Sequence, residues 1–342
     1  MIPARFACLL ISAAVAWSTV ARGPDDATVL ASLEKLGSQV KRDEDQKGRP
    51  VTRIDLGRDV KNADLKLLTR FKDLRFLSLV DTKVTSEGLD ELTDLRALRT
   101  LTIGGNLLTH KDLKRLKGIT GLQELSLIGP NVTDSNLDSL NELPDLRLLG
   151  IGWAPVTDAG LKHITALKNL EVLVIYHIDM TDDGMKSINE LGSLQKLAIV
   201  CKPLTDKGLA HLTNLKQLQF LDLTLAHMTG SGLKQFPRLQ ELNLKDSRVT
   251  DSGLKDLDAL HDLRNLDLTR TNVSGACLKH LKNLKKLTTL NLNGTALTDE
   301  GLTDLENVTS LETLDLSSTK LTASALNKLK GALPRCVFTG PP

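Results

Sequence analysis

Residues 298–321 read TDEGLTDLENVTSLETLDLSSTKL, and blocks of the same form begin at regular intervals from Thr85 almost to the C-terminus. The interval is 24 residues except between Thr229 and Thr250, where it is 21. Each block starts with Thr, or once with Ser274, and continues as T-D-x-G-L-x-x-L-x-x-L-x-x-L-x-x-L-x-L. A period of roughly 20–29 residues that contains L-x-x-L-x-L indicates a solenoid of stacked units.

Each block combines a strand pattern with a helix pattern. Two leucines separated by one residue, such as Leu314 and Leu316, point to one side of an extended strand, so their neighbours face the other side. Thr298 stands where a helix N-cap belongs, and Asp299 follows near the positive end of that helix. One unit cannot bury its leucines alone, so units stack. We therefore expect a curved α/β solenoid, with parallel strands on the concave face and short helices on the convex face.

The block spacing also predicts how the chain is divided. The first strand is marked by Ile54, and the markers continue to Leu314, which gives about 12 rungs. We expect the solenoid to span 51–338, with Cys336 and Phe338 in the two leucine positions of a terminal cap strand, and 339–342 to form a tail. The block that begins at Thr229 lacks one x-x-L triplet, so about one turn of helix should be missing there.

Residues 22–50 are predicted to form an N-terminal capping helix and a linker. Asp25 or Asp26 suits the N-cap of a helix whose apolar face covers the open end of the core. The charged segment 41–50 is predicted to be a loop. The apolar face of the helix is assigned to Val29, Leu30, Leu33, Leu36 and Val40.

Residues 1–21 have the pattern of a signal peptide. Arg5 precedes an apolar run from Phe6 to Trp17, and small residues suit cleavage after Ala16 or Ala21. The run is too short to span a bilayer comfortably, and a buried N-terminal helix is the alternative. We expect an exported protein, periplasmic, envelope-associated or secreted, without an integral membrane span.

Composition and motifs argue against several classes of function. Lys plus Arg is 44 and Asp plus Glu is 42, so charge gives no reason to expect a nucleic-acid or anionic-membrane partner. The sequence lacks the nucleophile-elbow, zinc-protease, dithiol and phosphate-loop motifs, so we expect no enzyme, no cofactor and no metal site. An odd number of cysteines follows the leader, namely Cys201, Cys277 and Cys336, and we expect free thiols that are buried or partly buried.

The concave positions of the middle blocks depart from the pattern of the others. They are apolar and aromatic, whereas those of later blocks are polar, and exposed aromatic clusters have the composition of a binding hot spot. Packing preferences of strands and drift between repeats are the alternative explanation. Trp153, His177, Cys201 and Leu225 share one block position and are expected to form a row where the strands end. The predicted protein-binding residues are Leu148, Trp153, Val172, Val174, Tyr176, His177, Val200 and Phe220.

The TDxGL block of 24 residues resembles that of exported bacterial leucine-rich-repeat proteins and, more distantly, the repeats of F-box adaptors and internalins. The resemblance implies a non-catalytic module that binds a protein or peptide. Two alternatives remain open, a structural or self-assembling envelope protein and a substrate-recognition adaptor similar to the F-box proteins. The sequence does not predict the oligomeric state.

Overall fold

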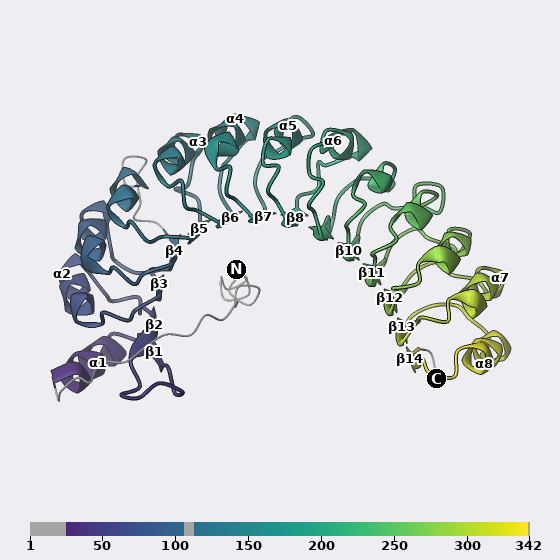
Figure 1. Ribbon diagram of the computed structural model, residues 1–342, viewed down its shortest axis with the longest axis horizontal. Helices are drawn as coiled ribbons and strands as arrows, with labels where there is room; N and C mark the ends of the chain where they lie inside the picture. The colour runs from purple at the N-terminus through teal and green to yellow at the C-terminus, as the bar shows by residue number, and fades with distance from the viewer. Residues whose placement is uncertain (1–24, 106–112, 341–342) are drawn as a thin grey trace.

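The computed structural model describes residues 25–105 and 113–340, which form one curved array (Figure 1). The strands line the inside of the arc and the helices lie on its outside (Figure 1). The predicted solenoid, with its parallel strands on the concave face, is confirmed. The predicted signal peptide, the residues between 105 and 113, and the last two residues of the predicted tail lie outside the described part of the chain.

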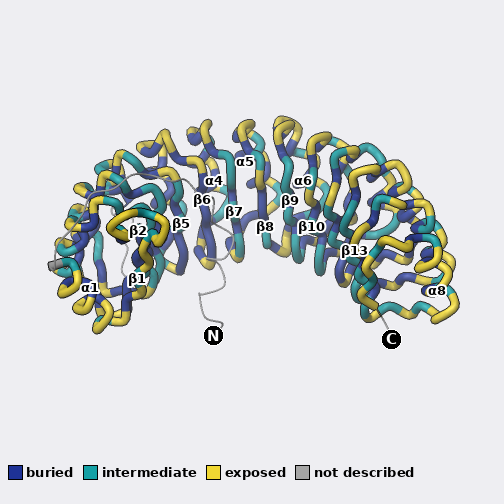
Figure 2. The backbone as a smooth tube through the Cα atoms, turned by 60° about the horizontal axis from the view of Figure 1, so that its bottom comes forward, coloured by how far each residue is buried: buried dark blue, intermediate teal, exposed yellow. Residues whose placement is uncertain are grey.

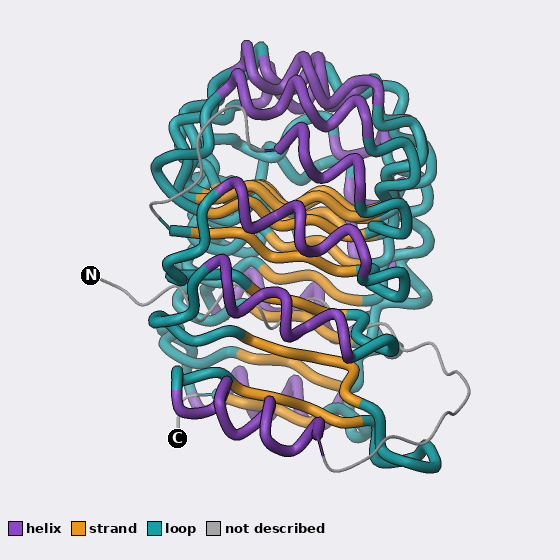
Figure 3. Tube along the Cα trace, turned by 90° about the vertical axis from the view of Figure 1, so that its left-hand side faces the viewer, coloured by secondary structure: helices purple, strands orange, loops and turns teal. Residues whose placement is uncertain are grey.

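All strands belong to a single sheet in which each strand pairs with its neighbours in chain order (Figure 3). β1 is antiparallel to β2, and the later pairs are parallel, with marker residues aligned, as Leu173 is with Leu197. The strands are β1 (Gln39–Arg42), β2 (Val51–Asp55), β3 (Phe76–Ser78), β4 (Thr100–Gly104), β5 (Glu124–Ile128), β6 (Leu148–Gly152), β7 (Val172–Tyr176), β8 (Lys196–Val200), β9 (Phe220–Asp222), β10 (Glu241–Asn243), β11 (Asn265–Asp267), β12 (Thr289–Asn291), β13 (Thr313–Asp315) and β14 (Val337–Thr339).

Short helices on the convex face connect the strands, and many are 3₁₀ rather than α-helical. The α-helices are α1 (Asp25–Lys35), α2 (Asn62–Leu65), α3 (Asp134–Leu137), α4 (Asp158–Leu161), α5 (Gly184–Asn189), α6 (Asp206–Ala210), α7 (Asp299–Leu302) and α8 (Ala323–Ala332). The 3₁₀ helices are η2 (Lys66–Arg70), η3 (Ser86–Asp94), η4 (Leu113–Gly118), η5 (Asp138–Glu142), η6 (Lys162–Ala166), η7 (Leu233–Gln235), η8 (Leu257–Ala259), η9 (Leu278–Asn283) and η10 (Thr303–Asn307). The short block that begins at Thr229 contains only the three-residue η7, and the full-length block that begins at Thr250 contains the equally short η8.

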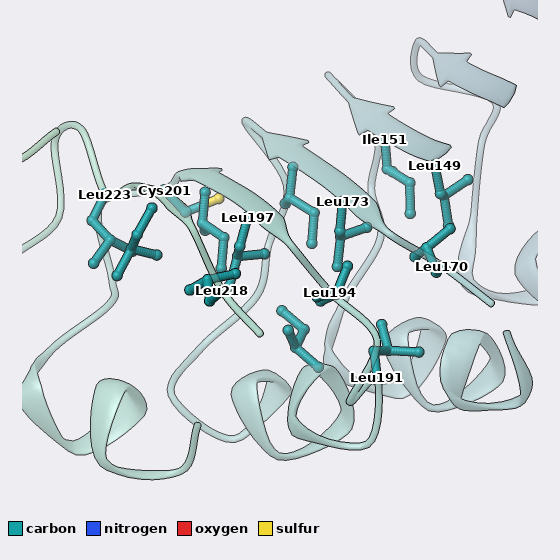
Figure 4. Packing of buried hydrophobic residues seen from close by; sticks show 14 of the residues in the cluster. Leu149, Ile151, Leu170, Leu173, Leu191, Leu194, Leu197, Cys201, Leu218 and Leu223 are labelled. Atoms are coloured by element: carbon teal, nitrogen blue, oxygen red, sulfur yellow. The ribbon is translucent and has the colours of Figure 1, made fainter. Parts of the chain in front are cut away.

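The block leucines form one continuous core between the sheet and the helices. Leu173 and Leu197 of the strands and Leu194 of the connecting segment are fully buried and pack together (Figure 4). Figure 2 shows that buried residues recur in every block, while exposed residues concentrate on the outer turns. The regular core supports the fold at every rung, so the concave side chains are not needed to fill it.

In six blocks the aspartate that follows the first threonine joins neighbouring blocks. Thr157 caps its helix as predicted, since its hydroxyl accepts the N–H of Ala159. The aspartate has a further role, because Asp158 accepts the N–H and the hydroxyl of Thr181 in the next block, at 2.8 and 2.6 Å. The same pair of bonds joins Asp134 to Thr157, Asp182 to Thr205, Asp206 to Thr229, Asp251 to Ser274 and Asp299 to Thr322. We call this series the Asp–Thr ladder.

The glycine of the T-D-x-G motif leaves room for this ladder. A Cβ atom built on Gly184 would lie 2.4 Å from Oδ1 of Asp158, far inside van der Waals contact. Gly208 has the same relation to Asp182, with a distance of 2.4 Å. The glycine of one block therefore accommodates the carboxylate of the block before it.

The Asp–Thr ladder is interrupted at two blocks. Gly230 and Gly275 stand at the position that carries aspartate in the six blocks of the ladder. At these places the N–H of Thr250 donates to the carbonyl of Thr229 at 3.1 Å, and the N–H of Thr298 donates to the carbonyl of Ser274 at 3.3 Å. A backbone bond thus replaces the two bonds to a charged group.

The two ends of the solenoid differ from the expected arrangement. The capping helix α1 ends at Lys35, and Val40 lies in strand β1 rather than on the helix, so the predicted linker begins within a strand. At the other end, Phe338 aligns with Leu314, so it occupies the first leucine position, which the sequence had assigned to Cys336. Cys336 lies just before β14 and is partly buried. In both places the chain departs from the repeat spacing, so the block pattern no longer fixes the register.

Cys201, Cys277 and Cys336 are free thiols, as predicted, and burial raises the pKa of each. In the described residues, no helix has the length and apolar character that a membrane span requires.

Candidate functional site

Strand alternation directs one set of side chains from the middle strands toward the concave surface. In β7, Leu173 and Ile175 are fully buried in the core, whereas Val172, Val174 and Tyr176 are partly exposed. Val200 of β8 and Phe220 of β9 are likewise partly exposed. Apolar side chains therefore face the concave surface across neighbouring strands, as the sequence predicts.

An aromatic cluster lies where β6 and β7 end. The rings of Trp153 and Tyr176 meet edge to face, with centroids 4.6 Å apart and an interplanar angle of 79°. The ring of His177 stacks on Trp153 at 5.7 Å and 19°. Such aromatic pairs contribute about 0.5–1.5 kcal/mol each beyond the burial of their area. The cluster is therefore an organised group rather than three independent side chains.

Glycine in β6 provides the space for Tyr176. A Cβ atom built on Gly152 would lie 2.0 Å from the Tyr176 ring, so the ring rests directly against the backbone of the neighbouring strand. Trp153 then follows Gly152 and remains 39% exposed, a high value for a large apolar side chain. The local sequence both positions the tyrosine and leaves the tryptophan exposed to solvent.

The backbone at Trp153 and His177 is left-handed, with φ values of 48° and 51°. Leu225, at the same block position, has φ 68°. This conformation costs a residue with a Cβ atom roughly 1–2 kcal/mol, and glycine adopts it freely. The same position in other blocks carries Asp81, Gly105, Gly129, Asp246, Arg270, Gly294 and Ser318, all with positive φ. Trp153 and His177 thus adopt a strained backbone conformation at a block position where three other blocks have glycine, which adopts it without strain.

Two of the residues singled out by sequence do not lie on the accessible surface. Leu148 is only 8% exposed, because it is covered between Glu124 of β5 and Val172 of β7. Cys201, expected in the row with Trp153 and His177, is buried with its sulfur 3.9 Å from the carbonyl oxygen of Ile178. The accessible patch therefore consists of Trp153, Val172, Val174, Tyr176, His177, Val200 and Phe220, and we call it the aromatic patch.

Sequence reasoning missed the left-handed backbone of the row and the space at Gly152. The sequence did contain a sign of the left-handed backbone, because glycine occupies the same block position at Gly105, Gly129 and Gly294. The described residues contain no group of three or more His, Cys, Asp or Glu side chains arranged to hold a metal ion.

A polar hollow of about 650 Å³ lies at the opposite ends of the same strands. It is lined by charged and amide side chains, among them Arg99, Gln123 and Gln195, and an ion pair of 2.7 Å between Arg147 and Glu171 crosses it. The cluster of Trp153, Tyr176 and His177 and the polar hollow therefore lie at different edges of the sheet.

Comparison with known proteins supports the fold. The family model described as Leucine Rich repeat matches residues 238–257 and 283–305. An internalin (inlF) from Listeria monocytogenes str. 4b F2365 has a similar structure, with 20% sequence identity and a TM-score of 0.60, over 92% of this chain and 93% of that chain. A leucine-rich-repeat protein from Leptospira interrogans matches with 19% identity and a TM-score of 0.48, over 84% and 89% of the two chains. No curated protein matches the sequence.

Proposed function

We propose that this leucine-rich-repeat protein, whose solenoid resembles that of an internalin, is an exported, non-catalytic module that binds a protein or peptide through the aromatic patch. The observation that carries the proposal is Trp153, which is exposed on a left-handed backbone and organised against Tyr176 and His177. Exposed and organised aromatic side chains are the usual anchors of protein interfaces.

The cost of exposing this patch supports a binding role. The block leucines already fill the core, so Tyr176 and Phe220 are not required to complete it. Trp153 additionally occupies a position where glycine is less strained. A role in binding accounts for both features, because a partner would bury the exposed rings and recover the free energy of their exposure.

The proposal is tested by replacing the exposed rings in Trp153→Ala/Tyr176→Ala/Phe220→Ala. Wild-type and variant proteins are used to capture partners from native envelope and medium fractions, and the captured proteins are quantified by mass spectrometry. Removing hot-spot aromatics costs about 2 kcal/mol or more each, so we expect capture to fall by at least about tenfold. Locating the native chain in the same fractions tests export.

Phe76→Ala provides the matched control, because Phe76 is an aromatic residue on the concave face of β3, outside the patch. Circular dichroism checks that each variant retains the solenoid. Undiminished capture by the triple variant would contradict the proposal, and self-association that is insensitive to these substitutions, measured by light scattering, would favour an assembly role.

A further inference from the structure

A column of alternating aspartate and asparagine side chains continues from the aromatic patch toward the C-terminus. Each member of the column lies between the two block leucines of its rung. The five strands that carry it, β9 to β13, pair in register, so the five side chains follow one another across the sheet. Its members are Asp222, Asn243, Asp267, Asn291 and Asp315. All five are partly exposed, so the column lies open on the concave face.

Local hydrogen bonds fix the side chains of this Asp/Asn column. One side-chain oxygen of each member accepts the N–H of the residue two positions later, as Asp267 does from Thr269 at 2.8 Å and Asp315 does from Ser317 at 2.9 Å. Nδ2 of Asn243 donates to the second oxygen of Asp222 at 3.1 Å. Alternation separates the charged members by an uncharged one, which limits repulsion between carboxylates on adjacent strands.

The column makes this half of the concave face acidic. In each of these rungs, three residues face the concave surface, one before, one between and one after the two block leucines. From β9 to β13 these positions carry Asp222, Glu241, Asp267 and Asp315 against the single cation Lys245. In the N-terminal half, Arg53 and Asp55 form an ion pair. A surface of one sign attracts the opposite charge over roughly 10 Å at moderate ionic strength.

Thr269 lies beside the column with its hydroxyl unsatisfied. It follows Asp267 on the concave side, is only 7% exposed, and its hydroxyl oxygen is one of two buried side-chain oxygens that lack a hydrogen-bond partner in the described residues. The equivalent Thr224 donates its hydroxyl to Asp222 at 2.6 Å. A buried polar group without a partner is costly, so the fold leaves the Thr269 hydroxyl unsatisfied beside the column, where the equivalent Thr224 has Asp222 as its acceptor.

The aromatic patch and the Asp/Asn column are continuous, because Phe220 and Asp222 lie on the same strand. Strands in a sheet are spaced by about 4.8 Å, so the column from Asp222 to Asp315 extends about 19 Å. An extended peptide covers that length with about six residues. A single short segment can therefore contact both features.

Resting on the proposed function, we infer that the partner is a protein segment that places an apolar or aromatic anchor in the aromatic patch and Lys or Arg side chains along the Asp/Asn column. Lysine and arginine supply both the charge and the N–H donors that the carboxylates accept. Nucleic acids and anionic lipid surfaces carry the same sign of charge as the column and are disfavoured.

Peptide display on the full chain tests the inference. A library of random dodecapeptides is selected on immobilised protein, and selected peptides are synthesised and measured by fluorescence polarisation at low and high salt. We expect the selected sequences to combine an apolar anchor with several Lys or Arg residues, and their affinity to fall as salt rises. Selection of peptides without a basic bias, or of none above background, would overturn the inference.

Asp222→Asn/Asp267→Asn/Asp315→Asn tests the column directly. Asparagine already occupies the column at Asn243 and Asn291, so the fold accommodates the change. We expect the affinity for selected peptides to fall about tenfold at low salt and its salt dependence to flatten, since three ion pairs of modest strength are removed. The matched control, Asp94→Asn/Asp258→Asn/Asp304→Asn, removes the same charge from the 3₁₀ helices and should alter affinity less than about twofold.

The two triple variants separate the two proposals. If the aromatic variant loses peptide binding and the column variant keeps it, the proposed function stands and the basic partner is wrong. If the column variant loses binding and the aromatic variant keeps it, the aromatic patch is not the anchor, and the inference fails together with the proposed function.

Discussion

Trp153 adopts a backbone conformation for which three other blocks use glycine. Its φ of 48° resembles the positive φ of Gly105, Gly129 and Gly294 at the same block position. The ring offsets part of the backbone cost through its contacts with Tyr176 and His177. Placing an exposed tryptophan ring at this position therefore lowers the folding stability of the chain.

Replacing Trp153 by glycine and by alanine separates these effects. Both changes remove the ring, but only Trp153→Gly relieves the left-handed backbone. We expect Trp153→Gly to be more stable than Trp153→Ala by about 1 kcal/mol, measured as the free energy of unfolding in urea. Equal stabilities would show that the backbone at this position is not strained.

For single residues, the sequence predicted which face of the sheet a side chain points to better than it predicted how exposed that side chain is. Strand alternation alone places Val172, Val174 and Tyr176 on the concave face, and the structure confirms that placement. The burial of Leu148 depends on the lengths of the side chains on both neighbouring strands, and that of Cys201 depends on a local backbone change. Neither quantity follows from the period of a single block.

The T-D-x-G element connects blocks as well as starting helices. Its threonine was predicted from helix capping, which is a local property of the sequence. The bonds from Asp158 to Thr181 join residues 23 positions apart, so they became visible only when the stacking of blocks was known. The glycine has the same explanation, because the group that it accommodates belongs to the preceding block.

Gly184→Ala tests the fit between blocks. The added methyl group would meet Oδ1 of Asp158, so we expect a loss of about 1–3 kcal/mol in the free energy of unfolding. In the background Asp158→Ala, which removes that oxygen, the same change should cost at least about 1 kcal/mol less. A double-mutant cycle by urea denaturation measures the difference.

Gly192→Ala is the matched control for this cycle, because a Cβ atom there would have no neighbour within 4 Å. We expect it to leave stability unchanged or slightly raised. If Gly184→Ala costs the same with and without Asp158, then the carboxylate is not what the glycine accommodates.

Two carboxylates of the Asp–Thr ladder, Asp251 and Asp299, make the stability of the array depend on pH. Burial opposes ionisation of Asp251, but bonds from Ser274 and Cys277 outweigh it and hold its pKa below the usual range. The N–H and hydroxyl of Thr322 lower the pKa of Asp299. A carboxylate whose pKa is lower in the folded state stabilises that state fully above its unfolded pKa, about 4, and loses the effect as pH falls through the folded value.

Lowering the pH should therefore remove the contribution of Asp251 and Asp299 to the free energy of unfolding. We expect the wild-type chain to have a higher urea midpoint than Asp251→Asn/Asp299→Asn at pH 7, and the gap to narrow as pH falls below about 4. Asparagine keeps one acceptor oxygen but no charge, so its bonds do not change over this range. A gap that stays constant from pH 7 to pH 3 would contradict this account.

At the scale of the whole molecule, the solenoid could be predicted from the sequence because every block buries its leucines in the same way, by stacking on its neighbours. The prediction was less accurate where the repetition stops. Val40 and Phe338 lie beside incomplete blocks, where the end of the core can be covered in more than one register. The aromatic patch was recognised by its departure from the repeat, and its role as a binding surface stays a prediction.

The two interruptions of the Asp–Thr ladder give the array an uneven mechanical strength. A force that pulls the ends of the arc apart is carried from block to block by the sheet and the leucine core, and most described junctions add two bonds to a carboxylate. At the same place, the junctions at Gly230 and Gly275 add only one backbone bond each. Under tension we therefore expect the solenoid to behave less like a uniform spring than like three stiffer segments joined by two softer links, both of which lie in the half that carries the Asp/Asn column.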